Sequence, residues 1–238
     1  MKPDISIIIV NWKVKDLLEK SLSSIFAYQK DYQVEVLVVD NNSQDGSVAM
    51  IKEKFPQVIL ISLSDNIGFG AANNLAIKEA QAEYIFLLNP DTEITEDFLD
   101  RALTYLKNNP SVGIMAPRII NSDGSKQLSI RRHPDLLSQV LIMFKLKNIL
   151  VNNKILNNYL LKDFDYNKEQ TVDQIMGAAM LIRKSVFEKI GTFDEKFFVW
   201  FEEVDLCKRA GQASIIIKYF PSAEIVHQGG ESFSKSNS

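Results

Sequence analysis

The sequence has one cysteine and lacks any long uncharged apolar run. Cys207 stands alone, which excludes an intrachain disulfide framework and a zinc site built from several thiolates. No stretch approaches the roughly 18 uncharged apolar residues that a membrane-spanning helix needs. Asp4 precedes the first apolar run, so the N-terminus lacks the pattern of a secretory signal peptide. These absences predict a cytoplasmic globular protein.

The sequence also lacks an excess of either charge. It has 27 basic and 30 acidic residues, and this balance gives no general electrostatic reason to bind nucleic acid. Hydrophobic residues make up 46% of the chain, close to the average for folded domains, which excludes intrinsic disorder. A length of 238 residues favours one large or two small domains, and the Ser-rich end at 232–238 is expected to be a mobile tail.

Short apolar runs alternate with helical patterns through the first half of the chain. The predicted strands are 5–10, 34–39, 58–63 and 84–88, and the predicted helices are 17–26, 44–54 and 69–81. Thr95 is predicted to cap the next helix. Strands and helices that alternate with short connections predict an α/β fold, with a mostly parallel central sheet flanked by helices.

The second half is less regular. Strands are predicted at 112–120 and 173–183, a turn at 121–124, and a helix at 204–210 that ends at Gly211. Residues 136–162 are apolar but carry several lysines. This pattern predicts an amphipathic surface helix or helix pair; alternatively, it is a basic, apolar face that rests on a lipid surface.

Polar residues follow three of the predicted strands. They are Asn11-Trp12, Asp40-Asn41-Asn42-Ser43 and Asn89-Pro90-Asp91. In an open α/β sheet, ligands bind beyond the carboxyl ends of the parallel strands. The three polar strand ends therefore predict a binding site on one edge of the sheet.

Asp91 is a candidate metal ligand. A carboxylate just past a buried strand suits Mg²⁺, which takes one or two protein carboxylates and completes its shell with substrate phosphates. The alternative is a simple helix cap in Asp91-Thr92-Glu93. His227 follows an apolar strand and precedes two glycines, and it is a candidate second ligand for a softer ion such as Mn²⁺.

The segment Gly68-Phe69-Gly70 precedes a predicted helix and invites a dinucleotide-binding interpretation. Two features argue against this interpretation: Asn73 replaces the third glycine, and the segment follows the third strand rather than the first.

A cluster of acids, Glu202, Glu203 and Asp205, opens the helix predicted near residue 204. Negative charge there suits the helix dipole. Aromatic residues including Trp200 surround the cluster, however, and partial desolvation raises a carboxylate pKa toward the range of a general base. Aromatic faces also stack on sugar rings.

These residues form motifs that resemble the family 2 inverting glycosyltransferases with the GT-A fold. The first motifs are Val10-Asn11-Trp12, Asp40-Asn41-Asn42-Ser43-x-Asp45-Gly46, Asn66-x-Gly68-Phe69-Gly70-x-x-Asn73 and Leu88-Asn89-Pro90-Asp91. Downstream come Gly191-x-Phe193-Asp194-Glu195-x-Phe197-Phe198, Glu202-Glu203-Val204-Asp205-Leu206 and His227-x-Gly229-Gly230-x-Ser232. Within the family, Gln127-x-Ser129-x-Arg131-Arg132-x-Pro134 resembles the rhamnosyltransferase branch, which uses dTDP-rhamnose.

The resemblance implies a role for individual residues. The nucleotide-sugar-binding positions are Asn11, Asp40, Asn42, Asn66, Gly68, Asn73, Asn89 and Asp91. Asp91 and His227 would hold Mg²⁺ or Mn²⁺, although Asn89 departs from the family's Asp-x-Asp motif and removes one negative charge. Glu203 falls on the family's general base, with Glu202 and Asp205 as alternatives. Arg131, Arg132 and Trp200 would contact the acceptor or phosphate.

The resemblance also implies a single GT-A domain over residues 1–231 and an overall function. Residues 1–110 would bind the nucleotide sugar and residues 111–231 the acceptor, a saccharide or polyprenol-linked saccharide used in cell-wall or surface polysaccharide synthesis. The chain would be cytoplasmic, with peripheral membrane contact through 136–162 on the inner face of the membrane. The alternatives are a sugar nucleotidyltransferase and a non-catalytic nucleotide- or carbohydrate-binding module.

Overall fold

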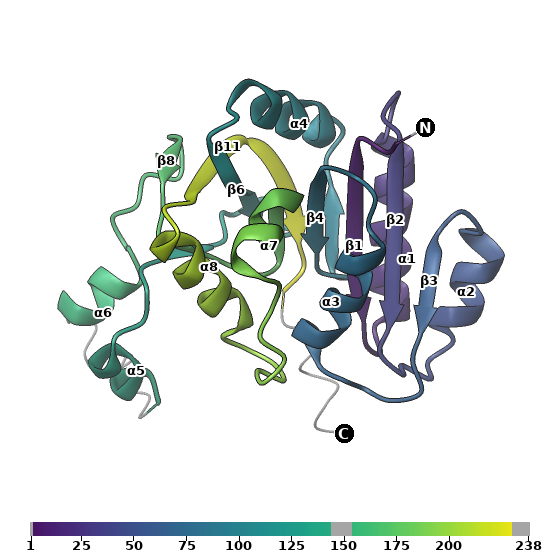
Figure 1. Cartoon of the computed structure of the whole chain (residues 1–238), viewed down its shortest axis with the longest axis horizontal. Coiled ribbons are helices and arrows are strands. Elements are labelled where there is room, and N and C mark those ends of the chain that lie inside the picture. Colours follow the sequence, from purple (N-terminus) through teal and green to yellow (C-terminus); the bar gives the residue numbers. More distant parts are fainter. Residues whose placement is uncertain (1, 144–153, 230–238) are drawn as a thin grey trace.

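A twisted sheet of nine strands crosses the part of the chain that the structure describes, with helices on both of its faces (Figure 1). The structure is a computed structural model that describes residues 2–143 and 154–229. The strand order is β3-β2-β1-β4-β10-β6-β11-β5, and β8 pairs with β11. A second sheet contains β7 and β9.

The elements have the following bounds. The strands are β1 Ile5–Asn11, β2 Val34–Asp40, β3 Ile59–Ser62, β4 Tyr84–Leu88, β5 Thr92–Ile94, β6 Val112–Ile120, β7 Ile130–Arg131, β8 Gln170–Thr171, β9 Gln174–Ile175, β10 Ala179–Arg183 and β11 Ile216–His227. The helices are α1 Lys15–Tyr28, α2 Ser47–Lys54, α3 Phe69–Glu79, α4 Phe98–Asn108, α5 Leu136–Met143, α6 Lys154–Tyr159, α7 Lys184–Ile190 and α8 Glu202–Gln212.

The first four strands confirm the predicted parallel sheet. β1 pairs in parallel with β2 on one side and β4 on the other, and β2 pairs in parallel with β3. Every residue of β1 and β4 is buried, as expected for apolar runs covered on both faces. Their carboxyl ends therefore meet on one edge of the sheet.

The sheet separates two hydrophobic cores. On one side α1, α2 and α4 contribute buried residues such as Leu18, Met50 and Phe98. On the other side α3, α7 and α8 contribute Ala76, Val186 and Leu206. Helices cover both faces of the sheet, which confirms the predicted α/β architecture.

The strands from the second half of the chain join the sheet in both parallel and antiparallel directions. β10 lies between β4 and β6 and runs antiparallel to both, whereas β11 runs parallel to β6. The predicted strand at 173–183 is wrong as one element, because β9 and β10 are separated at 176–178. There the backbone turns to other partners: Met176 N donates to Ser129 O, and Asn89 N donates to Ala178 O.

Two predicted helix ends are also wrong. Thr95 does not cap α4; its hydroxyl donates to the carbonyl of Glu224 at 2.8 Å, and the helix begins three residues later. Gly211 lies inside α8, which continues to Gln212. The left-handed backbone after the helix falls on Ser214, with a φ of 57°.

Residues 136–162 form two short helices where they are described. α5 and α6 lie together at one end of the molecule (Figure 1). This confirms the helix pair for those parts, while 144–153 and the predicted tail at 232–238 lie outside the described residues. Among the described residues, no helix is both long enough and apolar enough to span a membrane.

Candidate active site

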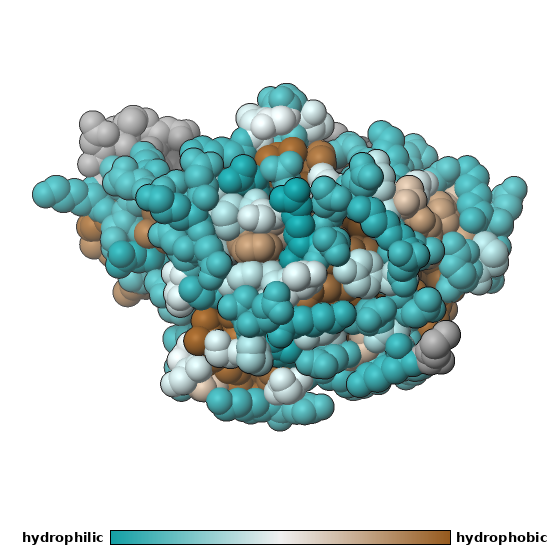
Figure 2. All heavy atoms as spheres, turned by 90° about the horizontal axis from the view of Figure 1, so that it is seen from above, coloured by the Kyte–Doolittle hydropathy of each residue, from teal (hydrophilic) through white to brown (hydrophobic). Residues whose placement is uncertain are grey.

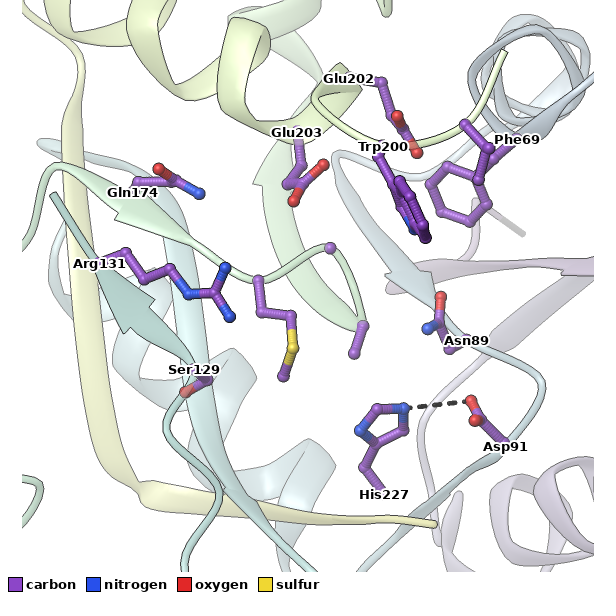
Figure 3. Close-up of a pocket in the computed structure, with 14 residues that line it drawn as sticks. Phe69, Asn89, Asp91, Ser129, Arg131, Gln174, Trp200, Glu202, Glu203 and His227 are labelled. Carbon is purple, nitrogen blue, oxygen red and sulfur yellow. Dashed lines mark ion pairs between the residues drawn. The ribbon is translucent and has the colours of Figure 1, made fainter. Parts of the chain in front are cut away.

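A cavity of about 330 Å³ opens beyond the carboxyl end of β4 (Figure 3). Its walls come from residues far apart in the sequence: the turn after β4, β7, the 176–178 connection, the start of α8 and the end of β11. Among the predicted site residues, the cavity collects Asn89, Asp91, Arg131, Trp200, Glu202, Glu203 and His227. We call it the central cavity.

Asp91 and His227 face each other on one side of the central cavity (Figure 3). His227 Nε2 lies 3.2 Å from Asp91 Oδ1, and the two residues are only 7% and 4% exposed. The pairing of β5 with β11 fixes this approach, because His227 lies opposite Thr92 and Gln228 N donates to the carbonyl of Asp91. The sheet register therefore brings together two residues separated by most of the chain.

This pair fits a divalent cation. Asp91 Oδ1 is buried and accepts no hydrogen bond from any described residue. Two ligands that each lie about 2.1 Å from an octahedral ion are separated by about 3.0 Å, close to the observed 3.2 Å. The described residues contain no group of three or more acidic, histidine or cysteine side chains that could hold a metal. A cation here would take its other ligands from substrate or water.

Glu202 and Glu203 lie across the central cavity from Asp91 and His227 in the view of Figure 3. Burial raises the pKa of Glu202 to about 7. Burial also raises the pKa of Glu203, although the nearby Arg131 charge opposes the increase. Asp205 is turned away: its carboxylate accepts a hydrogen bond from Arg209 Nε at 2.7 Å, and it lines neither the central cavity nor the smaller pocket beside it.

A strained bend in the backbone comes directly before Glu202 and Glu203, at the start of α8. Trp200 and Phe201, directly before the helix, have left-handed φ values of 70° and 71°. Such values are unusual for bulky residues and cost of order 1–3 kcal/mol each. Residues held this way cluster at binding and catalytic sites, and here the bend carries Trp200 into the cavity wall.

A smaller pocket of about 180 Å³ adjoins the central cavity, and we call it the side pocket. It contains the predicted residues Asn66 and Gly68, and it shares Asn89 with the central cavity. Its other walls are mostly apolar and include Val10, Trp12, Pro90 and Phe198. Flat apolar walls with a few amides suit a ring system such as a nucleobase.

Asn11 and Asp40 do not line the side pocket, although their chain neighbours Val10, Trp12 and Asn41 do. Both are buried, and Asn11 Nδ2 donates to Asp40 Oδ1 at 2.8 Å and to Ser43 Oγ at 2.9 Å. Ser43 N donates to the second oxygen of Asp40 at 3.1 Å. These bonds join the ends of β1 and β2, so in this structure the two residues support the loop that follows Asp40.

Three other predicted residues lie outside both cavities. Asn42 is half-buried with a φ of 59° and accepts a hydrogen bond from Gln44. Asn73 donates to the carbonyl of Phe69 within α3, and Arg132 is exposed. The structure thus does not bring these three side chains to the rest of the site.

Some lining residues have no individual role in the sequence prediction. Asn41 lines the side pocket and holds the loop between β3 and α3 in place. Its amide donates to Asn66 Oδ1 at 2.7 Å and accepts from Ile67 N at 3.0 Å. Gln174 and Gly177 line the central cavity. The glycine in an otherwise apolar run was the available signal for the break at 176–178.

An apolar groove of about 730 Å³ continues from the central cavity, with which it shares Arg131, Gln174, Trp200 and Glu203. Leu136, Val140 and Met143 from α5, with Tyr159, Phe201 and Val204, form its apolar walls. Leu136 is 83% exposed and Met143 is 69% exposed. The face seen in Figure 2, by contrast, is mainly hydrophilic, with hydrophobic residues in scattered patches.

Comparison with known proteins gives one matching family. Residues 6–191 match the family described as "Glycosyl transferase family 2". The chain is 29% identical over 226 residues to "N-acetylglucosaminyl-diphospho-decaprenol L-rhamnosyltransferase" of Mycobacterium tuberculosis, which covers 90% of this chain and 73% of that protein. It is 28% identical to "Rhamnosyltransferase WbbL" of Escherichia coli, over 93% of this chain and 82% of that protein. The predicted likeness to rhamnosyltransferases is confirmed.

Solved structures share the fold. A mannosyltransferase from Pyrobaculum calidifontis, in complex with GDP-Man and Mn²⁺, matches with a TM-score of 0.65 at 19% identity, over 97% of this chain and 58% of its own. GalNAc-T7 with UDP, GalNAc and Mn²⁺ matches with a TM-score of 0.69 at 14% identity, over 94% of this chain and 43% of its own. The chain thus spans about half the length of these structures. The predicted GT-A fold is confirmed.

Proposed function

The chain belongs to glycosyl transferase family 2, and from that membership we propose an inverting transfer of a sugar from a nucleotide diphosphate to an acceptor hydroxyl. One observation carries the proposal: the central cavity holds a pair of buried metal-ligand candidates, Asp91 and His227, across from the carboxylates Glu202 and Glu203. Such a site can neutralise a leaving diphosphate on one side and activate an acceptor on the other.

For the donor we propose dTDP-rhamnose. The relatives of this chain include proteins named as rhamnosyltransferases, one of them described as a "dTDP-rhamnosyl transferase" from Shigella flexneri. The side pocket, with Trp12 and Phe198 among its walls, would take the base, which puts the diphosphate near Asn89. Residues 1–110 supply most of this donor half, and Asp40 and Asn11 would act by supporting it.

Asp91 and His227 would hold Mg²⁺ or Mn²⁺ together with the donor diphosphate. When bound, the cation supplies positive charge that stabilises the leaving nucleoside diphosphate. The amide of Asn89 brings no charge to this wall, so Asp91 is the carboxylate that attracts the ion. Arg131 faces the same cavity and can pair with a phosphate oxygen or a sugar hydroxyl.

Glu203 is our proposed general base. It lies where the central cavity meets the apolar groove, whereas Glu202 lines only the cavity. An acceptor that enters by the groove would therefore meet Glu203 first. Its carboxylate would take the proton of the attacking hydroxyl while the bond to the diphosphate breaks on the opposite face of the sugar. One displacement of this kind inverts the anomeric configuration.

The apolar groove favours a saccharide acceptor linked to a polyprenol. A purely polar acceptor would cover little of the groove's apolar surface. A hydrocarbon tail in the groove would remove Leu136, Val140 and Met143 from water. The relative from Mycobacterium tuberculosis is named for a decaprenol-linked substrate. We propose that α5 and its surroundings rest on the membrane surface that presents such an acceptor.

A panel of nucleotide sugars, assayed for transfer with Mg²⁺ or Mn²⁺ and a polyprenol-linked saccharide, tests the proposal. We expect turnover of dTDP-rhamnose with the anomeric configuration inverted, a loss of about 10²–10⁴-fold in kcat for Glu203→Gln, and loss of metal dependence and activity for Asp91→Asn. Full activity in Asp91→Asn would overturn the metal site, and full activity in Glu203→Gln would overturn the base. Tight nucleotide binding without turnover of any donor would instead indicate a binding module.

A further inference from the structure

His227 is held by a side chain that has no assigned role. Its second ring nitrogen, Nδ1, lies 2.6 Å from Gln127 Oε1. Gln127 is half-buried and comes from the hairpin after β6, on the far side of the ring from Asp91. An amide oxygen only accepts hydrogen bonds, so this contact requires a proton on Nδ1.

The orientation of the Gln127 amide is fixed by a chain of hydrogen bonds. Gln127 Nε2 donates to Asn121 Oδ1 at 3.1 Å, and Asn121 Nδ2 donates to Ser125 Oγ at 2.8 Å. Ser125 Oγ in turn donates to Asp123 Oδ1 at 2.6 Å. An ionised carboxylate only accepts, so the direction of every hydrogen bond in this series follows from Asp123. If either amide were reversed, at least one contact would have no proton.

The backbone also holds Gln127 in place. Gln127 N donates to the carbonyl of Ile119, and Asn121 N donates to that of Ser125, so the hairpin is closed at both positions. On the other side Gly229 has a φ of 66°, and a Cβ atom there would lie 3.3 Å from Gln127 Nε2. The glycine therefore gives the amide room beside the ring.

We propose that Gln127 is a positioning residue for the metal site, which keeps the His227 proton on Nδ1 and leaves the Nε2 lone pair directed at the cation beside Asp91. This inference rests on the proposed function, since it concerns the same cation. Partners that orient a ligating histidine typically contribute 10–100-fold to metal affinity. Without Gln127 the ring can rotate, or it can carry its proton on Nε2, where the proton blocks the cation.

Gln127→Met tests the proposal, because it keeps the length of the side chain and removes the acceptor. We expect the Kd for Mn²⁺, measured by electron paramagnetic resonance with and without dTDP, to rise about 10–100-fold. Gln127→Glu keeps an acceptor oxygen and should bind Mn²⁺ at least as tightly as the wild type. Gln228→Met is the matched control, because Gln228 follows His227 but its amide donates to Glu93.

A second measurement needs no metal and no turnover. Nitrogen-15 NMR of the imidazole rings in the metal-free protein reports which nitrogen carries the proton, and the chain has only two histidines, so His133→Gln assigns the spectrum. We expect a protonated Nδ1 on His227 in the wild type and in Gln127→Glu, and a shift of the proton toward Nε2 in Gln127→Met.

The proposal is overturned if Gln127→Met leaves both the Mn²⁺ affinity and the His227 proton position unchanged while its thermal unfolding matches the wild type. It is also overturned if Gln127→Glu binds Mn²⁺ as weakly as Gln127→Met. If the wild type binds no Mn²⁺ at all, the proposed function loses its metal, and the NMR comparison still decides whether Gln127 sets the proton position of His227.

Discussion

At Glu202, the protein holds a carboxylate in surroundings that favour its neutral form. The side chain is only 5% exposed, and its Oε2 atom has no hydrogen-bond partner among the described residues. Burial is the main cause of its raised pKa, and the neighbouring charge of Glu203 adds to it. The two acids differ because the charge of Arg131 opposes the effect of burial on the pKa of Glu203.

This difference predicts a pH-dependent stability. The folded protein holds the Glu202 proton up to a pH of about 7, whereas an ordinary Glu releases it near 4.5, so the free energy of unfolding falls as the pH rises between these values. Glu202→Gln removes that loss. Glu202 lines the central cavity, whose solvent screens part of the effect. After a reduction for that screening, we expect the variant to be more stable than the wild type by about 1–2 kcal/mol at pH 8 and to match it at pH 4.

Thermal unfolding at both pH values measures this effect, which corresponds to a rise in Tm of about 3–6 °C at pH 8. Glu188→Gln is the control, because it removes the same charge from an exposed position on α7. An equal gain in both variants would mean that net charge, and not the burial of Glu202, sets the stability.

At the residue scale, the sequence predicts which residues form the site better than it predicts what each of them contacts. Asp91 and His227 were predicted from their places after apolar strands, and the structure puts them 3.2 Å apart. Asn73 was predicted from a motif, yet its amide bonds to Phe69 within its own helix. The motif that contains Gln127 gives this residue no role, because its contact with His227 depends on a hairpin and a strand that are 100 residues apart.

At the scale of elements, the turn before α3 is tied to the strained loop before α8. Gly68 has a φ of 86°, and a Cβ atom there would lie 2.5 Å from the carbonyl oxygen of Phe198. Phe69 N donates to that same oxygen at 3.0 Å. The two segments form adjoining walls of the side pocket, so the proposed donor site depends on this close approach.

Gly68→Ala should therefore harm the site beyond its cost in backbone strain. We expect an increase of at least about tenfold in the KM for the donor and a stability loss of about 1–3 kcal/mol, because the new methyl group pushes the Phe198 carbonyl away. Steady-state kinetics and thermal unfolding measure the two effects.

Gly191→Ala provides the comparison, since Gly191 has a similar φ of 78° but its Cβ would meet nothing closer than 3.9 Å. We expect that variant to lose about 1–3 kcal/mol of stability through backbone strain alone, less than Gly68→Ala loses, and to keep its KM. Equal KM values for the two variants would show that the contact with Phe198 does not shape the donor site.

The predicted ends of helices and strands are wrong where tertiary contacts override the local sequence pattern. The four parallel strands were predicted because each is a continuous apolar run bounded by turns, and a buried strand needs little else. The run at 173–183 resembles one more strand, but its backbone at 176–178 pairs with Ser129 and Asn89 instead of continuing one ladder. These partners are distant in the sequence, and no periodicity reports them.

For the whole molecule, the apolar groove predicts attachment to membranes. Leu136 and Met143 project from α5 at one end of the protein, next to the entrance of the central cavity. Leu136→Glu combined with Met143→Glu should lower the partition onto anionic vesicles at low salt by at least about tenfold, because two apolar side chains no longer enter the lipid.

Co-sedimentation with vesicles measures the partition. Ile59→Glu is the control, since Ile59 is 43% exposed on β3, near the opposite edge of the sheet. Equal losses in the control and the double variant, or no binding by the wild type, would contradict attachment through α5.

The pairing of Thr92 with His227 has a consequence for how the protein acquires its site. The metal-ligand candidates meet only when β11 docks beside β5, which closes a loop of more than a hundred residues, and such distant contacts form slowly during folding. The first parallel pairing closes a much shorter loop, because Ile5 of β1 lies opposite Val34 of β2. Cation binding would then report the completion of folding, and a bound cation would hold the last strand in place by mass action.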